Sequence, residues 1–415
     1  MKQYVIIGNG VAATGCIEGI RSIDRDNPIL IISEEPHPVY CRPLISYYLE
    51  GKTDLTRMKY RPDDFYKKQN CEVMYGKKAA GIDPSAKRVF LDDSTVLPYD
   101  ALCVATGSSP FIPPIDGLDS VEHKFSFLTL DDTLALESAI SEDSKVLIVG
   151  AGLIGLKCVE GLHGRVADIV VCDLADRVLS SILDNECAEL MQKHLEDNGI
   201  RFMLGDSVSR FEKNTAHMKS GRELSFDVLV LAVGVRPNVS LIKDAGGEVN
   251  RGIIIDSHMQ TTLPDVYSAG DCTESLDFSC GKRRVLALLP NAYMQGSCAG
   301  HNMAGDTAVF ENPIPMNSIG FFGLHAMTAG SYFTPEEGGE LHEERSCGTL
   351  KRFYTKDGCL TGYIIIGDTD RAGIYTSLIR EKTPLSAIDF ESLKKSATSA
   401  VFSAEIRRKK FGGVV

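Results

Sequence analysis

Two glycine-rich turns carry the residues of this chain that are best suited to hold phosphate groups. The first contains Gly8, Gly10 and Ala13 and directly follows a short apolar run. The second is the complete Gly150-Ala151-Gly152-Leu153-Ile154-Gly155, which also follows an apolar run. A dinucleotide pyrophosphate needs backbone N–H donors at a helix N-terminus with no side chains in the way, and glycines between strand and helix meet that need. We expect strands at 4–7 and 145–149, and helices from 11 to 22 and from 153.

Each turn is followed by a second apolar run that ends on a carboxylate. Glu34 follows the run 29–33, and Asp173 follows the run 168–172. An acid about 20 residues after the first glycine accepts hydrogen bonds from adenosine ribose hydroxyls. Asp173 there repels the 2′-phosphate of NADP and so favours NAD, although Arg177 a few residues on can offset that repulsion. One such motif can be an ordinary glycine-rich turn with a solvated strand end, but two in tandem favour two dinucleotide-binding domains.

Length and composition agree with a multidomain α/β protein. At 415 residues the chain exceeds one ordinary core, and its 43% hydrophobic residues and 38 glycines suit a packed fold. The formal charge of −12 and the pI of about 5.3 argue against nucleic-acid binding through a global positive field. The apolar runs are too short to span a membrane and the start of the sequence does not resemble a secretory signal, so we expect a cytoplasmic protein. The twelve cysteines show no zinc or iron-sulfur spacing, so we expect mostly reduced thiols and no metal site.

Three further motifs give the chain a family resemblance. Ala105-Thr106-Gly107 follows an apolar strand, and the segment 261–271 ends on Asp271. Gly234 lies in the segment 231–238, which begins with apolar residues. Taken singly, the threonine could terminate a strand and the aspartate could cap a helix. In this order, over roughly residues 1–310, they resemble the pyridine nucleotide-disulfide oxidoreductase superfamily. The resemblance implies that the first glycine turn binds FAD and the second binds NAD(H), with NADP less suited.

The resemblance implies an α/β fold with two Rossmann-like, three-layer ββα dinucleotide-binding domains and a C-terminal α+β domain. The NAD domain is expected as an insertion in a discontinuous FAD domain, so that both cofactors meet at a shared cleft. We place the boundaries at 1–112 and 241–315 for the FAD-binding domain, 113–240 for the NAD-binding domain and 316–415 for the C-terminal interface domain. In the last domain, 349–354 and 360–366 should pair as a hairpin, and 384–411 should form a polar helical tail.

The resemblance also implies which residues line the cofactors. The segment 40–51 resembles the Y-x-R-x-x-[LI]-S segment of rubredoxin reductases, ferredoxin reductases and the flavin domain of nitrite reductase. The segment 288–296 resembles a helix start at the pyrimidine end of the flavin, where the helix dipole stabilises negative charge. The residues implied for FAD are Gly8, Gly10, Ala13, Glu34, Arg42, Pro43, Ala80, Ala105, Thr106, Gly107, Asp271, Asn291 and Ala292, and those implied for NAD are Gly150, Gly152, Leu153, Ile154, Gly155, Asp173 and Gly234.

Several positions depart from the family pattern. Disulfide-reducing members carry a C-x4-C or C-x-x-C pair that is absent from this sequence, so electrons are expected to leave the flavin for an external carrier. Cys41 lies where coenzyme A-disulfide reductases and NADH oxidases keep one redox cysteine, but it falls on a variable position of the Y-x-R segment, which favours an ordinary thiol. Relatives often have Glu where Lys157 stands and Lys where Tyr47 stands. Lys157 is therefore either a surface lysine or a cation for the flavin, in which case Lys157→Ala should shift the flavin midpoint potential or slow hydride transfer.

These observations predict an FAD-dependent NADH:acceptor oxidoreductase. Hydride moves between NAD(H) and FAD, and single electrons move between FAD and a ferredoxin, a rubredoxin or an iron-sulfur subunit. A more specific version is the electron-transfer subunit of a complex like phenylglyoxylate dehydrogenase, a 2-oxoacid oxidoreductase; a homodimer is also open. The alternatives are a free-standing NADH oxidase or coenzyme A-disulfide reductase that uses Cys41, and a flavin-dependent sensor like apoptosis-inducing factor. The basic segment 407–410 is either a solvated helix end or a docking site for an acidic redox protein.

Overall fold

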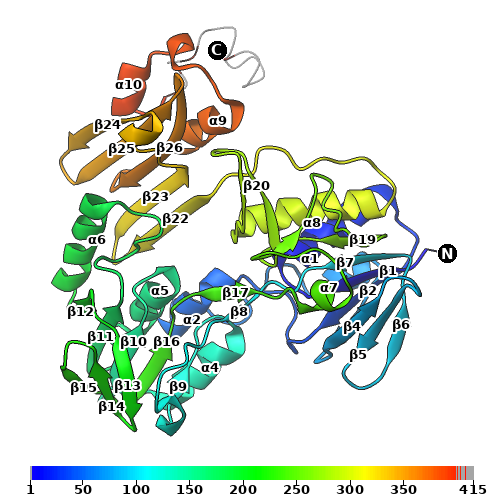
Figure 1. Cartoon of the computed structure of the whole chain (residues 1–415), viewed down its shortest axis with the longest axis horizontal. Helices are drawn as coiled ribbons and strands as arrows, with labels where there is room; N and C mark the ends of the chain where they lie inside the picture. The colour runs from blue at the N-terminus through cyan, green and yellow to red at the C-terminus, as the bar shows by residue number, and fades with distance from the viewer. Residues whose placement is uncertain (1, 399, 401, 403–406, 408–415) are drawn as a thin grey trace. The chain divides into compact units, whose positions relative to one another are not determined.

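The computed structural model describes residues 2–398 together with 400, 402 and 407. Figure 1 shows the helices and strands of the chain. The described residues fall into two compact units. The first unit comprises Met1–Ala175, Ile200–Leu276 and Arg283–Glu311, and the second comprises Asp176–Gly199, Asp277–Lys282 and Asn312–Val415. The predicted boundaries between the FAD and NAD domains stay a prediction.

The first parallel sheet of unit 1 is built around the first glycine turn. Its strand order is β19-β7-β1-β2-β3, and its central strands β1 and β7 are fully buried, as expected when both faces of a parallel sheet are covered. The predicted strands and the helix after the turn are confirmed. The elements are β1 (Tyr4–Ile7), α1 (Val11–Ile23), β2 (Ile29–Ser33), α2 (Ile45–Leu49), α3 (Phe65–Lys68), β3 (Cys71–Tyr75), β7 (Ala101–Val104) and β19 (Val266–Ser268), with a small antiparallel sheet of β4 (Ala79–Asp83), β5 (Arg88–Leu91) and β6 (Val96–Pro98).

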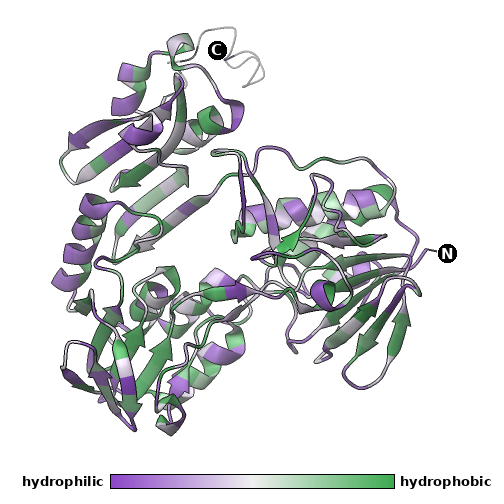
Figure 2. Cartoon of the chain, viewed as in Figure 1, coloured by the Kyte–Doolittle hydropathy of each residue, from purple (hydrophilic) through white to green (hydrophobic). Residues whose placement is uncertain are grey.

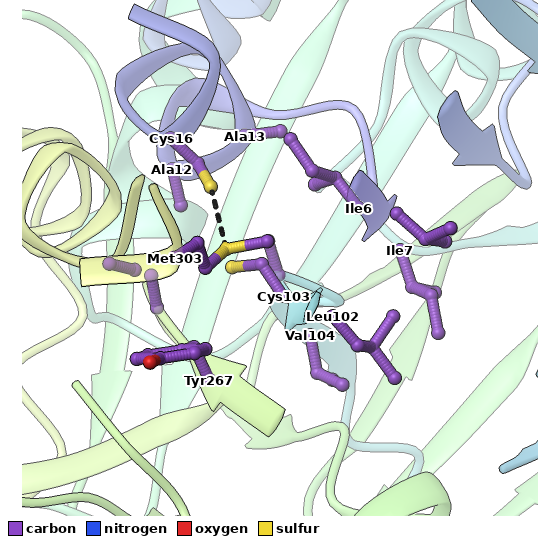
Figure 3. Packing of buried hydrophobic residues seen from close by; sticks show 14 of the residues in the cluster. Ile6, Ile7, Ala12, Ala13, Cys16, Leu102, Cys103, Val104, Tyr267 and Met303 are labelled. Atoms are coloured by element: carbon purple, nitrogen blue, oxygen red, sulfur yellow. Dashed lines mark hydrogen bonds between the residues drawn. The ribbon is translucent and has the colours of Figure 1, made fainter. Parts of the chain in front are cut away.

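Helix α8 (Leu289–Met303) packs directly on the backbone of α1. A Cβ placed on Gly15 would lie 2.2 Å from the carbonyl oxygen of Tyr293, and one placed on Gly296 would lie 2.0 Å from that of Ala12. Any larger residue at these positions therefore forces the two helices apart. Figure 3 shows the core beneath this crossing, where the Cys16 thiol lies 3.6 Å from the sulfur of Met303.

The second parallel sheet of unit 1 repeats the plan around the second glycine turn. Its order is β12-β11-β10-β16-β9, and the predicted strands at 145–149 and 168–172 are confirmed. Its central strands are mainly hydrophobic in Figure 2. The elements are β9 (Lys124–Phe125), α4 (Leu130–Ala139), β10 (Lys145–Val149), α5 (Leu153–Leu162), β11 (Asp168–Asp173), β12 (Arg201–Leu204) and β16 (Val228–Leu231), with a small antiparallel sheet of β13 (Val208–Glu212), β14 (Thr215–Met218) and β15 (Glu223–Ser225).

Two chain segments that join the parts of unit 1 are paired with each other. Strands β8 (Ser108–Pro110) and β17 (Val235–Pro237) run antiparallel. Next to them, the Asn238 side-chain amide donates to the Thr106 carbonyl oxygen at 2.9 Å. The remaining short elements are α7 (Ser240–Asp244), β18 (Ile253–Ile254), β20 (Thr273–Asp277) and β21 (Lys282–Arg284).

Unit 2 is organised on an antiparallel sheet of order β22-β23-β26-β25-β24. The predicted hairpin is confirmed, because β25 and β26 pair across a turn in which Asp357 and Gly358 have positive φ. The elements are α6 (Asn185–Asp197), β22 (Met316–Phe321), β23 (Leu324–Gly330), β24 (Gly339–Ser346), β25 (Thr349–Lys356), β26 (Cys359–Ile366), α9 (Gly373–Glu381) and α10 (Phe390–Lys395).

The predicted polar helix over 384–411 is wrong in its extent within the described residues. Helix α10 covers six residues there, starting at the cap Asp389, whose side chain accepts from the backbone N–H of Ser392, and ending at the extended Ser396. Polar composition alone therefore did not define a continuous helix. Of the basic segment 407–410, residues 408–410 lie outside the described residues.

Candidate functional site

A cavity of about 850 Å³ lies at the carboxyl ends of the first parallel sheet. Its lining includes the segments that follow β1, β2, β7 and β19. Ligands of open α/β sheets bind at this edge, and the volume is in the upper range of small-molecule sites. The cavity is also lined by Leu153, Ile154 and Lys157 of α5, the helix that follows the second glycine turn.

The structure brings many of the predicted site residues together in this cavity. Those that line it are Gly8, Gly10, Glu34, Arg42, Pro43, Ala105, Thr106, Gly107, Asp271, Ala292, Leu153, Ile154 and Lys157. The other predicted residues are outside its lining, namely Ala13, Cys41, Ala80, Asn291, Gly150, Gly152, Gly155, Asp173 and Gly234. Ala80 is exposed on β4 while its neighbour Ala79 lines the cavity, and Asn291 is buried at the start of α8.

The first glycine turn fits a phosphate group. Gly8 has φ +107°, and a Cβ there would lie 2.2 Å from the Ala105 carbonyl oxygen, so the chain itself requires glycine. Gly10 is different, because a Cβ there would meet no described atom within 4 Å and would point into open space. Helix α1, all of whose residues the structure describes, begins directly after Gly10. No side chain caps its N-terminus, and its first turn contains no acidic residue. Its N-terminal N–H groups and positive dipole end are thus available to an anion.

The second glycine turn has the same construction. A Cβ on Gly150 would lie 2.3 Å from the Ala232 carbonyl oxygen, whereas one on Gly152 would meet no described atom within 4 Å. Asp173 is held beside this turn, because its carboxylate accepts from the backbone N–H of Ala151 at 2.7 Å and of Ala175 at 2.8 Å. The predicted acid therefore lies next to the predicted phosphate cradle.

Sequence analysis passed over a second acid at the end of β2. Glu34 is 69% exposed and pairs with the Lys78 ammonium at 2.8 Å. The adjacent Glu35 also lines the cavity, where it accepts from the Tyr40 hydroxyl at 2.7 Å and pairs with the Arg42 guanidinium. Strand alternation turns neighbouring side chains to opposite sides, so two consecutive acids leave open which one faces a ligand.

Asp271 is a half-buried carboxylate in the cavity wall. Burial raises its pKa above the usual aspartate range, and the positive charge of Arg42 opposes that rise. A carboxylate that loses part of its solvation is stabilised by hydrogen-bond donors from a partner. The hydroxyl groups of a ribityl or ribose chain are donors of this kind.

The two candidate catalytic residues lie in different surroundings. Cys41 is half-buried, lies outside the cavity lining, and has a pKa raised by burial. Lys157 lines the cavity, with its Nζ atom 2.7 Å from Oε2 of Glu160 and 5.2 Å from the centroid of the Tyr47 ring.

A family model described as pyridine nucleotide-disulphide oxidoreductase matches residues 2–296. The chain belongs to this family. It is an oxidoreductase whose cofactors are FAD and NAD(H), as the resemblance implied. Among the described residues, no helix is both long and apolar enough to cross a membrane.

Named relatives cover most of the chain. The phenylglyoxylate dehydrogenase subunit epsilon of Aromatoleum evansii, an NADH-dependent enzyme, is 33% identical over 93% of this chain and 93% of its own length. An NADH oxidase of Methanocaldococcus jannaschii is 34% identical over 74% of this chain and 71% of its own length. Other relatives are longer proteins of which this chain spans about half. A chain of the covalent putidaredoxin reductase-putidaredoxin complex has a TM-score of 0.87 at 22% identity, covering 96% of this chain and 97% of that one, which shows the shared fold.

Cys41→Ser is expected to leave turnover with NADH and an artificial electron acceptor unchanged. The raised pKa keeps the thiol protonated at neutral pH, and a protonated thiol is a poor nucleophile. Steady-state kinetics of the two proteins provide the measurement. A severe loss of turnover in the serine variant would instead identify Cys41 as a redox group.

Asp271→Asn should stabilise the FAD-free protein and weaken FAD binding. Because the folded-state pKa of Asp271 is raised, stability present at acid pH is lost as the pH rises through that pKa, and asparagine removes this loss. FAD binding should weaken by about tenfold or more, since hydrogen bonds to charged groups are worth about 1.5–3 kcal/mol. Thermal unfolding at neutral pH, with and without FAD, measures both effects. A lower unfolding temperature of the FAD-free variant would contradict the expectation.

Proposed function

We propose that this chain is an NADH:acceptor oxidoreductase that passes electrons through FAD to an iron-sulfur or rubredoxin-type protein. The observation that carries the proposal is one cavity lined by residues that follow both glycine turns. Hydride transfer needs its donor and acceptor to meet across a short gap without water, and a shared cavity meets that requirement.

The residues around the first glycine turn are assigned to FAD. The N-terminus of α1 holds the pyrophosphate, and Asp271 accepts hydrogen bonds from hydroxyl groups of the cofactor. The N-terminus of α8, with Leu288, Leu289 and Ala292 in the cavity wall, places a positive dipole end toward the site. When bound, FAD supplies the exchange between two-electron hydride chemistry and one-electron transfer.

The residues around the second glycine turn are assigned to NADH. The N-terminus of α5 holds the pyrophosphate, and Asp173, fixed by two backbone N–H groups, faces the adenosine ribose. A carboxylate there disfavours a 2′-phosphate, so NADH is the preferred donor. Leu153 and Ile154, which follow this turn, line the cavity that is assigned to FAD.

The relative named as an epsilon subunit supports a role inside a larger complex. We place this chain, in the cytoplasm, as the subunit that exchanges electrons between NAD(H) and iron-sulfur subunits of a 2-oxoacid oxidoreductase. A homodimer that serves a free ferredoxin or rubredoxin is the simpler form of the same proposal.

A free-standing NADH oxidase is the second candidate, favoured by the relative from Methanocaldococcus. Anaerobic rapid mixing with NADH, followed by ferredoxin, rubredoxin, dioxygen or coenzyme A disulfide, separates the candidates. Fast loss of the visible flavin absorbance and fast reoxidation by an iron-sulfur or rubredoxin-type protein are expected. Fast reoxidation by dioxygen alone would favour the oxidase. Slow reduction with a long-lived charge-transfer complex would favour a sensor and overturn the proposal.

A further inference from the structure

The cavity wall contains a junction between two helices that lie far apart in the sequence. Helix α5 approaches α2 so closely that a Cβ on Gly161 would lie 3.0 Å from the Ser46 carbonyl oxygen and 3.1 Å from Cβ of Leu49. Lys157 lies one helical turn before Gly161 and therefore on the same side of α5. Lys157, which lines the cavity, is thus held where α5 meets α2.

The ammonium of Lys157 lies close to a carboxylate and to an aromatic ring at this junction. It pairs with Oε2 of Glu160 at 2.7 Å and lies 5.2 Å from the centroid of the Tyr47 ring, whose face attracts cations. The Lys157 side chain is 22% exposed, and that of Glu160 is 8% exposed. A carboxylate buried to this degree needs a compensating charge, which Lys157 supplies.

The two charges of this pair have opposite effects on the electrostatic potential in the cavity. Hydride transfer from NADH adds two electrons and one proton to the flavin ring, releases NAD⁺ and leaves negative charge on the ring. A fixed cation near the site favours that reduced state, and a fixed anion disfavours it. Because electrostatic interactions are strong in partly buried sites, each member of the pair should influence the flavin, and their close approach should cancel much of the field.

We propose that Lys157 and Glu160 form a charge-balanced pair that sets the reduction potential of the flavin. Lys157 raises the potential, and Glu160 both positions the lysine and attenuates its field. This inference rests on the proposed binding of FAD in the shared cavity. It extends the expected role of Lys157 to a second, buried residue that the sequence pattern does not single out.

The test is the flavin midpoint potential of FAD-loaded variants, measured anaerobically against reference dyes at a pH well above the usual pKa of glutamate. Glu160→Gln should raise the potential, and Lys157→Met should lower it. The double variant should lie closer to the wild type than either single variant, and Lys157→Arg, which keeps the charge, should retain the wild-type value. Lys145→Met, an exposed lysine at the start of β10, is the control and should have no effect.

Shifts of the same sign in the two single variants, or shifts no larger than that of the control, would overturn the inference. A merely structural role of the pair predicts shifts of the same sign, because loss of packing does not depend on the sign of the removed charge. The proposed function fails in a different way: the wild-type chain would then not bind FAD or would not be reduced by NADH. The two failures are therefore distinguishable in the same set of proteins.

Discussion

Gly10→Val is expected to give a folded protein that no longer holds FAD. A valine Cβ at this position meets no described atom within 4 Å, and the extended φ of −97° suits any residue. Its methyl groups, however, occupy the space in front of the α1 N-terminus in which the pyrophosphate is proposed to lie. We expect FAD affinity to fall by about a hundredfold or more, since this overpacking costs about 1–3 kcal/mol and the phosphate hydrogen bonds are lost with it. Bound flavin per polypeptide and the circular dichroism spectrum measure cofactor and fold separately.

Gly8→Val is the matched contrast on the same turn. Gly8 needs a left-handed φ of +107°, and its Cβ would collide with the Ala105 carbonyl oxygen, so this variant should lose folded protein as well as FAD. If Gly10→Val instead bound FAD as tightly as the wild type, Gly10 would lie outside the cofactor site.

Gly152→Val is expected to keep FAD bound but to slow its reduction by NADH by about a hundredfold or more, for the same reasons of space and lost hydrogen bonds. The position is again open, with no described atom within 4 Å of a Cβ, and it lies at the N-terminus of α5. Rapid-mixing kinetics with NADH measure the loss, and reduction by dithionite at the wild-type rate shows that the flavin itself is intact.

Together, Gly10→Val and Gly152→Val decide which turn holds which cofactor. A colourless Gly152→Val protein beside a yellow Gly10→Val protein that NADH no longer reduces would reverse the assignment. Loss of FAD in both variants would mean that the second turn supports the fold of the first, which the separate sheets do not suggest.

The glycine turns and their strands could be predicted from the sequence because their constraints are local. Gly8 and Gly150 are required by backbone geometry within the turn, and the buried parallel strands appear as uninterrupted apolar runs. The residues that sequence analysis missed depend on contacts between distant segments. Glu35 is recognised through Arg42 and Tyr40, and Glu160 through Lys157 at the junction with α2.

The crossing of α1 and α8 shows the same limit. Gly15 and Gly296 lie within helices and not in turns. Glycine is required at these positions because of the close contact with the opposing helix, which the local sequence does not reveal. The end of the chain illustrates the reverse error, because polar composition without a cap at the right place predicted a helix far longer than α10. The local sequence thus predicts the glycine turns well, but it predicts poorly which distant residues line the cavity.

The pairing of β8 with β17 bears on whether a segment of this chain can be replaced by the equivalent segment of a related protein. The chain passes from the first parallel sheet to the second and back along two hydrogen-bonded neighbours, Ser108–Pro110 and Val235–Pro237. Because the two strands are neighbours, both ends of the segment 111–234 lie close together. This segment can therefore be replaced without rerouting the chain on either side of it. Under the proposed assignment, a chimaera that takes residues 111–234 from a relative with a different nucleotide preference should therefore still bind FAD while accepting electrons from a different nucleotide.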